Sequence, residues 1–248
     1  KREDGIAIID ANRNQLERVL RDSSDPEQVA LSVNGESLYV ASEDTGKGIA
    51  IDVATGRVRG SVEVGGQPEG VAVHPRRNIV YFTSEVGNSV AVSDATRLRV
   101  LSTVAVGQRP RDIAVAPDGS RAYVSGESDA SLVVLDGNTD AVITKLTVPG
   151  GGARPKGVVL SSDGKRLYVS TGRGGEIVAY DTQSMSVLGF VKVGARPWGL
   201  ALSPDGHTLY VANGPSDDVS VVTTDPLHVE ATVKVGKRPW GVAVLPVK

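Results

Sequence analysis

Residues 197–213 read PWGLALSPDGHTLYVAN and contain two short apolar segments on either side of a turn. Residues 200–202 (LAL) predict one β-strand, and residues 209–213 (LYVAN) predict the next. Between them Pro204 sets φ near −65° and Gly206 supplies a positive φ, so Ser203–Gly206 is expected to close a hairpin. Further strands are predicted at residues 219–222 and 229–235. Together the four segments predict a small antiparallel sheet.

The same arrangement recurs along the chain. Each repeat opens with a proline, and successive prolines lie 42, 42, 45, 42 and 42 residues apart: Pro26, Pro68, Pro110, Pro155, Pro197 and Pro239. An aspartate follows the first four prolines at a constant distance, at Asp52, Asp94, Asp136 and Asp181, and Asp10 fits the same frame. A period of about 40–45 residues with several short strands is typical of propeller blades. We therefore predict an all-β fold, a β-propeller of four-stranded antiparallel blades.

The frame predicts a single propeller domain over residues 1–248, with blades that begin near residues 26, 68, 110, 155, 197 and 239. Residues 1–25 supply only strands three and four of a partial N-terminal blade, and residues 238–248 supply only a first strand. Six blades are thus visible, the sixth incomplete. Either the two ends combine into a three-stranded blade, or native chain is missing ahead of Lys1. Residues 15–20 (QLERVL) could form an amphipathic helix, but the frame assigns them to an outer strand.

Composition and charge exclude several classes of protein. The chain has 27 basic and 29 acidic residues, interspersed along its length, so it lacks the basic footprint of a nucleic-acid-binding protein. No apolar run approaches the roughly 18 residues that a membrane helix needs, so no membrane span is expected. The absence of cysteine excludes disulfides and thiolate metal sites. No Gly-x-Ser-x-Gly elbow, His-Glu-x-x-His site or P-loop occurs.

The predicted second strands resemble the YVTN family of β-propellers. They read LYVAS (38–42), VYFTS (80–84), AYVSG (122–126), LYVST (167–171) and LYVAN (209–213). The segments at residues 25–27, 67–70, 108–111 and 238–244 further resemble the subgroup encoded beside PQQ-dependent alcohol oxidation. That resemblance implies a periplasmic or extracellular protein with seven blades in its full-length form. It also implies an N-terminal signal and about one and a half blades that this chain lacks, which favours missing native chain over a shared blade.

The candidate site follows from propeller geometry. The loops that precede the innermost strand and those that join strands two and three are expected on one face, around the channel mouth. Around the repeat prolines the residues change from acidic to basic to aromatic along the chain, while the frame stays the same. The candidate ligand-binding residues are Glu69, Arg109, Arg111, Lys156, Arg196, Trp198, Arg238 and Trp240, with the loop carboxylates Glu43, Glu85 and Glu127. No catalytic or metal-binding residue is assigned.

Two kinds of ligand would suit these residues. A flat anion could stack on Trp198 or Trp240 while a neighbouring guanidinium holds its carboxylate. The alternative is that the arginines bridge to groups of neighbouring blades and that the tryptophans cap the channel. Carboxylates that converge from several blades could hold Ca²⁺, which takes six to eight oxygen ligands, or could be simply solvated.

Two recurring residue types have a simpler explanation. The blade aspartates end third strands, and residues 52–56 (DVATG) form a typical Asx-turn sequence, so we expect capping rather than catalysis. His74, His207 and His228 are expected on the face opposite the mouth, which favours neither a shared metal site nor a haem ligand. Residues 74–77 (HPRR) depart from the Asp-Gly turn of the other repeats, so an irregular turn is predicted there.

The sequence leads to three functional hypotheses. The first is a non-catalytic binding propeller outside the cytoplasm that holds a partner protein or a small anionic ligand at the mouth; the resemblance implies a role accessory to PQQ-dependent oxidation. The second is a lactonase-like, metal-dependent hydrolase with Glu43, Glu85 or Glu127 as the general base. The third is a surface-layer or adhesion module. No cofactor is required by the sequence, although PQQ and Ca²⁺ are the candidates.

Overall fold

The computed structural model describes residues 4–21 and 23–245, and within them it contains β-strands and one 3₁₀ turn but no α-helix. The ends of the predicted frame, residues 1–3 and 246–248, lie outside the described residues. The chain divides into two compact units, Lys1–Ile113 (unit 1) and Ala114–Lys248 (unit 2), which are described separately. That residues 1–248 form one propeller domain remains a prediction.

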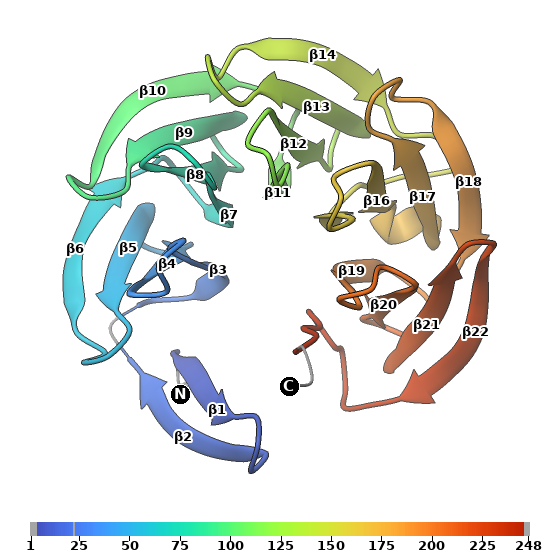
Figure 1. Cartoon of the computed structure of the whole chain (residues 1–248), viewed down its shortest axis with the longest axis horizontal. Coiled ribbons are helices and arrows are strands. Elements are labelled where there is room, and N and C mark those ends of the chain that lie inside the picture. The colour runs from blue at the N-terminus through green and yellow to red at the C-terminus, as the bar shows by residue number, and fades with distance from the viewer. Residues whose placement is uncertain (1–3, 22, 246–248) are drawn as a thin grey trace. The chain divides into compact units, whose positions relative to one another are not determined.

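Unit 1 contains one two-stranded sheet and two four-stranded sheets, in which sequential strands are neighbours (Figure 1). The strands are β1 (Ile6–Asp10) and β2 (Gln15–Leu20); then β3 (Pro26–Leu31), β4 (Ser37–Ser42), β5 (Lys47–Asp52) and β6 (Val58–Glu63); then β7 (Pro68–Val73), β8 (Ile79–Ser84), β9 (Ser89–Asp94) and β10 (Arg99–Ala105). Their pairing is antiparallel throughout. Each four-stranded sheet is therefore a blade of the predicted kind.

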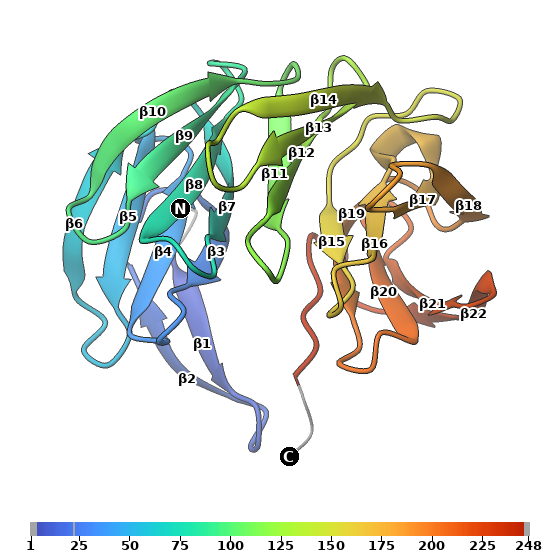
Figure 2. The same ribbon diagram turned by 45° about the horizontal axis from the view of Figure 1, so that its top comes forward.

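Unit 2 contains three sheets of the same order (Figure 2). The boundary between the units falls within the first of these strands, between Ile113 and Ala114. The strands are β11 (Pro110–Val115), β12 (Arg121–Gly126), β13 (Ser131–Asp136) and β14 (Val142–Thr147); β15 (Val158–Leu160), β16 (Arg166–Ser170), β17 (Glu176–Asp181) and β18 (Val187–Lys192); and β19 (Pro197–Leu202), β20 (Thr208–Asn213), β21 (Asp218–Thr224) and β22 (Leu227–Lys234). The 3₁₀ turn η1 (Gly172–Gly174) joins β16 to β17.

These elements confirm the all-β fold class and most of the predicted strands. Residues 15–20 form strand β2 rather than a helix, and residues 197–234 form the four strands expected of one repeat. One prediction is wrong over the described residues: no strand forms at residues 238–245. A strand needs a ladder partner, and here the backbone makes a single cross-strand bond, from the Gly199 N–H to the Trp240 carbonyl at 3.0 Å.

Within each unit, the sheets pack face to face through apolar side chains. In unit 1, Tyr39 and Val62 of one sheet share a buried cluster with Val71 and Phe82 of the next. The first strands also approach each other closely, because glycine recurs two residues after the repeat proline. A Cβ on Gly70 would lie 2.8 Å from the Arg111 carbonyl oxygen. The backbones therefore touch where a side chain would keep them apart.

The blade aspartates cap turns, as predicted. The Asp52 carboxylate accepts hydrogen bonds from the Thr55 N–H at 2.8 Å and from its hydroxyl at 2.6 Å, and Asp10, Asp94, Asp136 and Asp181 make equivalent bonds. These bonds favour the ionised form and hold the pKa of Asp52, Asp94 and Asp181 below the usual value. A residue with positive φ closes each turn, for example Gly56 at 71°. The aspartates are therefore structural.

Candidate functional site

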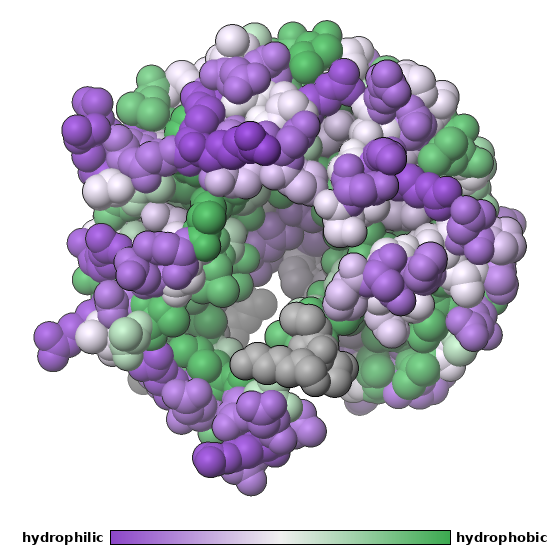
Figure 3. Space-filling model, in the orientation of Figure 1, coloured by the Kyte–Doolittle hydropathy of each residue, from purple (hydrophilic) through white to green (hydrophobic). Residues whose placement is uncertain are grey.

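Two sets of loops meet at one end of the strands in both units. They are the loops before the repeat prolines and the loops between second and third strands, and we call them the proline-end loops. In unit 1 the Asn88 side-chain oxygen accepts a hydrogen bond from the Arg109 N–H at 2.8 Å. In unit 2 the Asp217 carboxylate binds the Arg238 N–H at the same distance. Figure 3 shows the opposite end of the strands, where hydrophilic side chains gather on the turns and hydrophobic side chains show along the strands.

The proline-end loops of unit 1 hold a buried charge cluster. Arg111, only 8% exposed, contacts Glu69 at 2.5 Å and also pairs with Glu85; both carboxylates are at least 94% buried. Arg109 is half-exposed and binds the second oxygen of Glu85 through Nε at 2.7 Å. Two arginines thus offset two glutamates, as in the bridging arrangement considered above. Glu85 is engaged by two cations, so it is poorly placed to act as a general base.

A second cluster in unit 1 is acidic. One carboxylate oxygen from each of Asp25, Glu27 and Glu43 lies within 4.8 Å of the others, and all three residues are half-buried. The Glu43 N–H binds the Asp25 carbonyl at 3.0 Å, and the Gln67 side chain donates to Oε1 of Glu43 at 3.1 Å. Asp25 itself has a φ of 45°, in the left-handed region. Of these three, only Glu43 was among the candidate ligand-binding residues; Asp25 and Glu27 belong to the acidic positions that flank the first repeat proline.

The residues of the acidic cluster suit a hard divalent cation. Carboxylate oxygens are the preferred ligands of Ca²⁺ and Mg²⁺, and three carboxylates supply up to six of them. At the position after the repeat proline, the first two four-stranded sheets have glutamates, Glu27 and Glu69, whereas the third has Arg111. Glu27 lies in the acidic cluster, whereas Glu69 pairs with Arg111.

The proline-end loops of unit 2 hold an aromatic and cationic cluster. The rings of Trp198 and Trp240 lie 4.1 Å apart between centroids and are inclined by 55°. The Lys156 ammonium is 3.6 Å from the Trp240 centroid and 5.5 Å from that of Trp198, and Arg196 lies 5.2 Å from the Trp198 centroid. Trp198 and Lys156 are buried, whereas Trp240 remains 42% exposed. Only part of this surface is therefore open to a ligand.

Two other predicted positions are Arg238 and Glu127. Arg238 is exposed, and its backbone has a φ of 51°, a left-handed conformation that it shares with Gln67, Arg109 and Arg196 before their prolines. Glu127 is half-buried in the loop between β12 and β13 of unit 2. The repetition of the left-handed residue at successive prolines indicates a structural role for the backbone there.

Comparisons with known proteins agree on the fold. A family model described as a lactonase with a seven-bladed β-propeller matches residues 95–237, more than half of the chain. A search of the curated proteins finds no match. Among solved structures, a functionally unknown protein of Desulfotomaculum acetoxidans is 16% identical with a TM-score of 0.81, over 94% of this chain and 77% of that one.

Two further structures are similar. A Bacteroides uniformis protein described as a “putative 6-phosphogluconolactonase” is 19% identical with a TM-score of 0.79, over 95% of this chain and 79% of that one. Hydrazine synthase of Kuenenia stuttgartiensis is 19% identical with a TM-score of 0.60, over 90% of each chain. At these identities the similarity shows the fold alone. No helix among the described residues has the length and hydropathy to cross a bilayer.

Proposed function

The chain belongs to the family of seven-bladed β-propeller lactonases, and from that membership we propose that it hydrolyses a small lactone. The observation that carries this proposal is the convergence of the Asp25, Glu27 and Glu43 carboxylates in the proline-end loops of unit 1. The cluster lies outside the matched residues, so its part in the reaction rests on geometry and chemistry. This reading replaces a purely binding role as the leading hypothesis, because the family match favours hydrolysis.

Glu43 is the best placed general base. Its Oε1 is held by Gln67 at 3.1 Å, which fixes the side chain and leaves the carboxylate otherwise directed into the cluster. As base, Glu43 would take a proton from water while the oxygen attacks the lactone carbonyl. The ring C–O bond then breaks and the ring oxygen takes the proton, giving a hydroxy acid. A divalent cation held by Asp25 and Glu27 would supply Lewis-acid assistance.

The test is hydrolysis of a lactone panel by the wild-type chain and by the Glu43→Gln variant. We expect Glu43→Gln to reduce kcat by about 10²-fold or more, the usual contribution of a general base. Asp25→Asn should weaken activation by added Ca²⁺ or Mg²⁺. Glu63→Gln is the matched control, because Glu63 is exposed on β6 and pairs with Lys47 at 3.3 Å. Hydrolysis that survives Glu43→Gln would exclude this mechanism, and an inert wild-type chain would exclude the activity.

A second candidate function is binding of a flat anion in unit 2. Its support is the inclined tryptophan pair beside Lys156 and Arg196, since aromatic faces and guanidinium suit a planar carboxylate ligand such as PQQ. A role outside the cytoplasm, accessory to PQQ-dependent oxidation, is the form that the YVTN resemblance favours. PQQ should raise the Tm of the wild-type chain and leave that of a Trp198→Ala, Trp240→Ala double variant unchanged. Equal shifts in both proteins would place the ligand elsewhere.

A further inference from the structure

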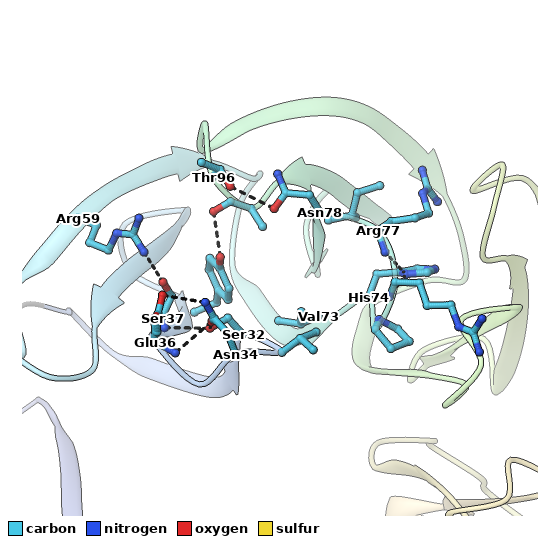
Figure 4. Close-up of a pocket in the computed structure, with 16 residues that line it drawn as sticks. Ser32, Asn34, Glu36, Ser37, Arg59, Val73, His74, Arg77, Asn78 and Thr96 are labelled. Atoms are coloured by element: carbon cyan, nitrogen blue, oxygen red, sulfur yellow. Dashed lines mark hydrogen bonds between the residues drawn. The ribbon is translucent and has the colours of Figure 1, made fainter.

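A pocket lies in unit 1 at the ends of the strands opposite the proline-end loops, away from the acidic cluster. Its volume is about 540 Å³, within the range of small-molecule sites. One wall is the β3–β4 turn and the other is the β7–β8 turn, where Val73, His74 and Asn78 face Ser32, Asn34 and Ser37 (Figure 4). We call this space the notch. The sequence predicted the irregular turn at residues 74–77 but not this pocket.

The notch departs from the repeat on its first wall. Unit 2 has two equivalent spaces, of about 460 and 310 Å³, and an arginine from the second strand crosses each one. Arg121 donates to the Thr182 carbonyl, and Arg166 donates to the Thr224 carbonyl at 3.2 Å. In unit 1 the corresponding residue is Ser37, too short to cross. The equivalent carbonyl, that of Ala95, is bound instead by the Tyr39 hydroxyl at 2.9 Å.

The notch also departs from the repeat on its second wall. The spaces in unit 2 are lined there by the regular turn, which presents the carboxylate of Asp163 or Asp205. In unit 1 the corresponding residue is Arg76, in the irregular turn predicted from the sequence. His74 is almost fully buried and organises this turn, because its Nδ1 accepts the Arg76 and Arg77 N–H groups at 3.1 and 2.9 Å. At this turn position the acidic side chain of the unit 2 repeats is thus replaced by the basic side chain of Arg76.

The notch is lined both by charged side chains and by uncharged hydrogen-bonding side chains. Arg59 reaches in from β6 and donates to the Ser37 hydroxyl at 2.5 Å. Arg76 and Arg77 also line the notch, although the Arg77 side chain extends away from the Ser37 wall (Figure 4), and the lining carboxylate is Glu36. The remaining polar lining consists of amides and hydroxyls that both donate and accept: Ser32, Asn34, Asn78 and Thr96. Asn34 occupies a turn position that is aspartate in the unit 2 repeats, and its amide donates to Glu36 at 2.7 Å.

From these two departures and this lining we propose that the notch binds a small polyhydroxylated anion, either a sugar acid or a sugar phosphate. Guanidinium groups would hold the anionic group, since their planar donor fork matches carboxylate and phosphate oxygens. The amide and hydroxyl side chains would bind the ligand hydroxyls. This site is separate from the acidic cluster and does not depend on the proposed hydrolysis.

The test is isothermal titration of the whole chain with four probes: gluconate, glucuronate, glucose 6-phosphate and uncharged glucose. We expect at least one anionic probe to bind with a Kd below about 10 mM and at least 10-fold more tightly than glucose. Gluconate or glucuronate binding identifies a carboxylate ligand, and binding of glucose 6-phosphate alone identifies a phosphate. Binding should persist in the Glu43→Gln variant.

Ser37→Arg is the decisive variant, because it restores the arginine that crosses the equivalent spaces in unit 2. It should weaken binding more than 10-fold while far-UV circular dichroism and Tm remain those of a folded protein. Arg59→Gln, a change at an exposed residue, should weaken the anionic probes and leave the uncharged one unaffected. Arg121→Ser, at the matched position in unit 2, should leave binding unchanged. The proposal is overturned if no anionic probe binds, or if Ser37→Arg and Arg59→Gln both bind as tightly as the wild type.

Discussion

Arg111→Met would leave two buried carboxylates without their shared cation. Glu69 and Glu85 are at least 94% buried, and Arg111 lies between them with 8% of its side chain exposed. Removing one partner of a buried ion pair costs about 3–5 kcal/mol, because the remaining charge stays desolvated. Arg109 still contacts Glu85 but is half-exposed, so it cannot replace Arg111. For a chain of this size that loss lowers Tm by roughly 6–20 °C.

The assay is urea unfolding followed by far-UV circular dichroism, with hydrogen exchange of β7 and β8 as a local measure. Lys47→Met is the control, because the Lys47–Glu63 pair is exposed and an exposed pair contributes about 1 kcal/mol or less. The triple variant Arg111→Met, Glu69→Gln, Glu85→Gln should recover most of the lost stability, since it leaves no buried charge there. If Arg111→Met cost no more than Lys47→Met, the argument that these carboxylates are desolvated would be wrong.

Three further predictions concern stability. Trp198→Ala should lower the free energy of unfolding by about 3–5 kcal/mol because the ring is buried, whereas Trp240→Ala should lower it by about 1 kcal/mol. Equal losses in urea unfolding would contradict the argument from burial. Gly157→Ala should cost about 1–3 kcal/mol, because its Cβ would collide with the Trp198 carbonyl oxygen, and Gly151→Ala, whose Cβ meets nothing, should cost almost nothing. Hydrogen bonds hold the pKa values of five carboxyl groups below the usual range. Their contribution to the free energy of unfolding should therefore be complete above about pH 4 and should fall as the pH drops through the folded-state pKa values. A Tm that stays constant from pH 5 to strong acid would refute this. The five groups are Asp52, Asp94, Asp163, Asp181 and Asp205.

The period of the repeat was enough to predict most of the fold. Proline spacing and the Asp-Gly turns located the strands, and the constant aspartate predicted the Asx caps, because both depend on residues close together in the chain. The strand predicted at residues 238–248 failed over the part described because strand formation depends on a pairing partner, which a local pattern cannot supply.

The candidate site was less predictable because its contacts join different repeats. The proline spacing predicted that the residues flanking the prolines lie at the same end of the strands as Glu43 and Glu85, and they do. It could not show that Arg111 bridges two glutamates or that Lys156 is buried against tryptophan, since rotamer and burial decide those contacts. The sequence did not predict the notch, because its signal is a difference between repeats, Ser37 against Arg121 and Arg166, whereas the frame rests on what the repeats share.

Tyr39, Arg121 and Arg166 each form a hydrogen bond from a second strand to the next sheet. These bonds also determine how local unfolding would spread from one sheet to another. Within each unit a sheet contacts mainly its immediate neighbours, so stability resembles the sum of a row of coupled segments. A weakened sheet would then raise amide exchange in the adjacent sheets and progressively less beyond them. In unit 1 the two-stranded sheet β1–β2 has the fewest strands to lose, so we expect opening to begin there and move inward one sheet at a time.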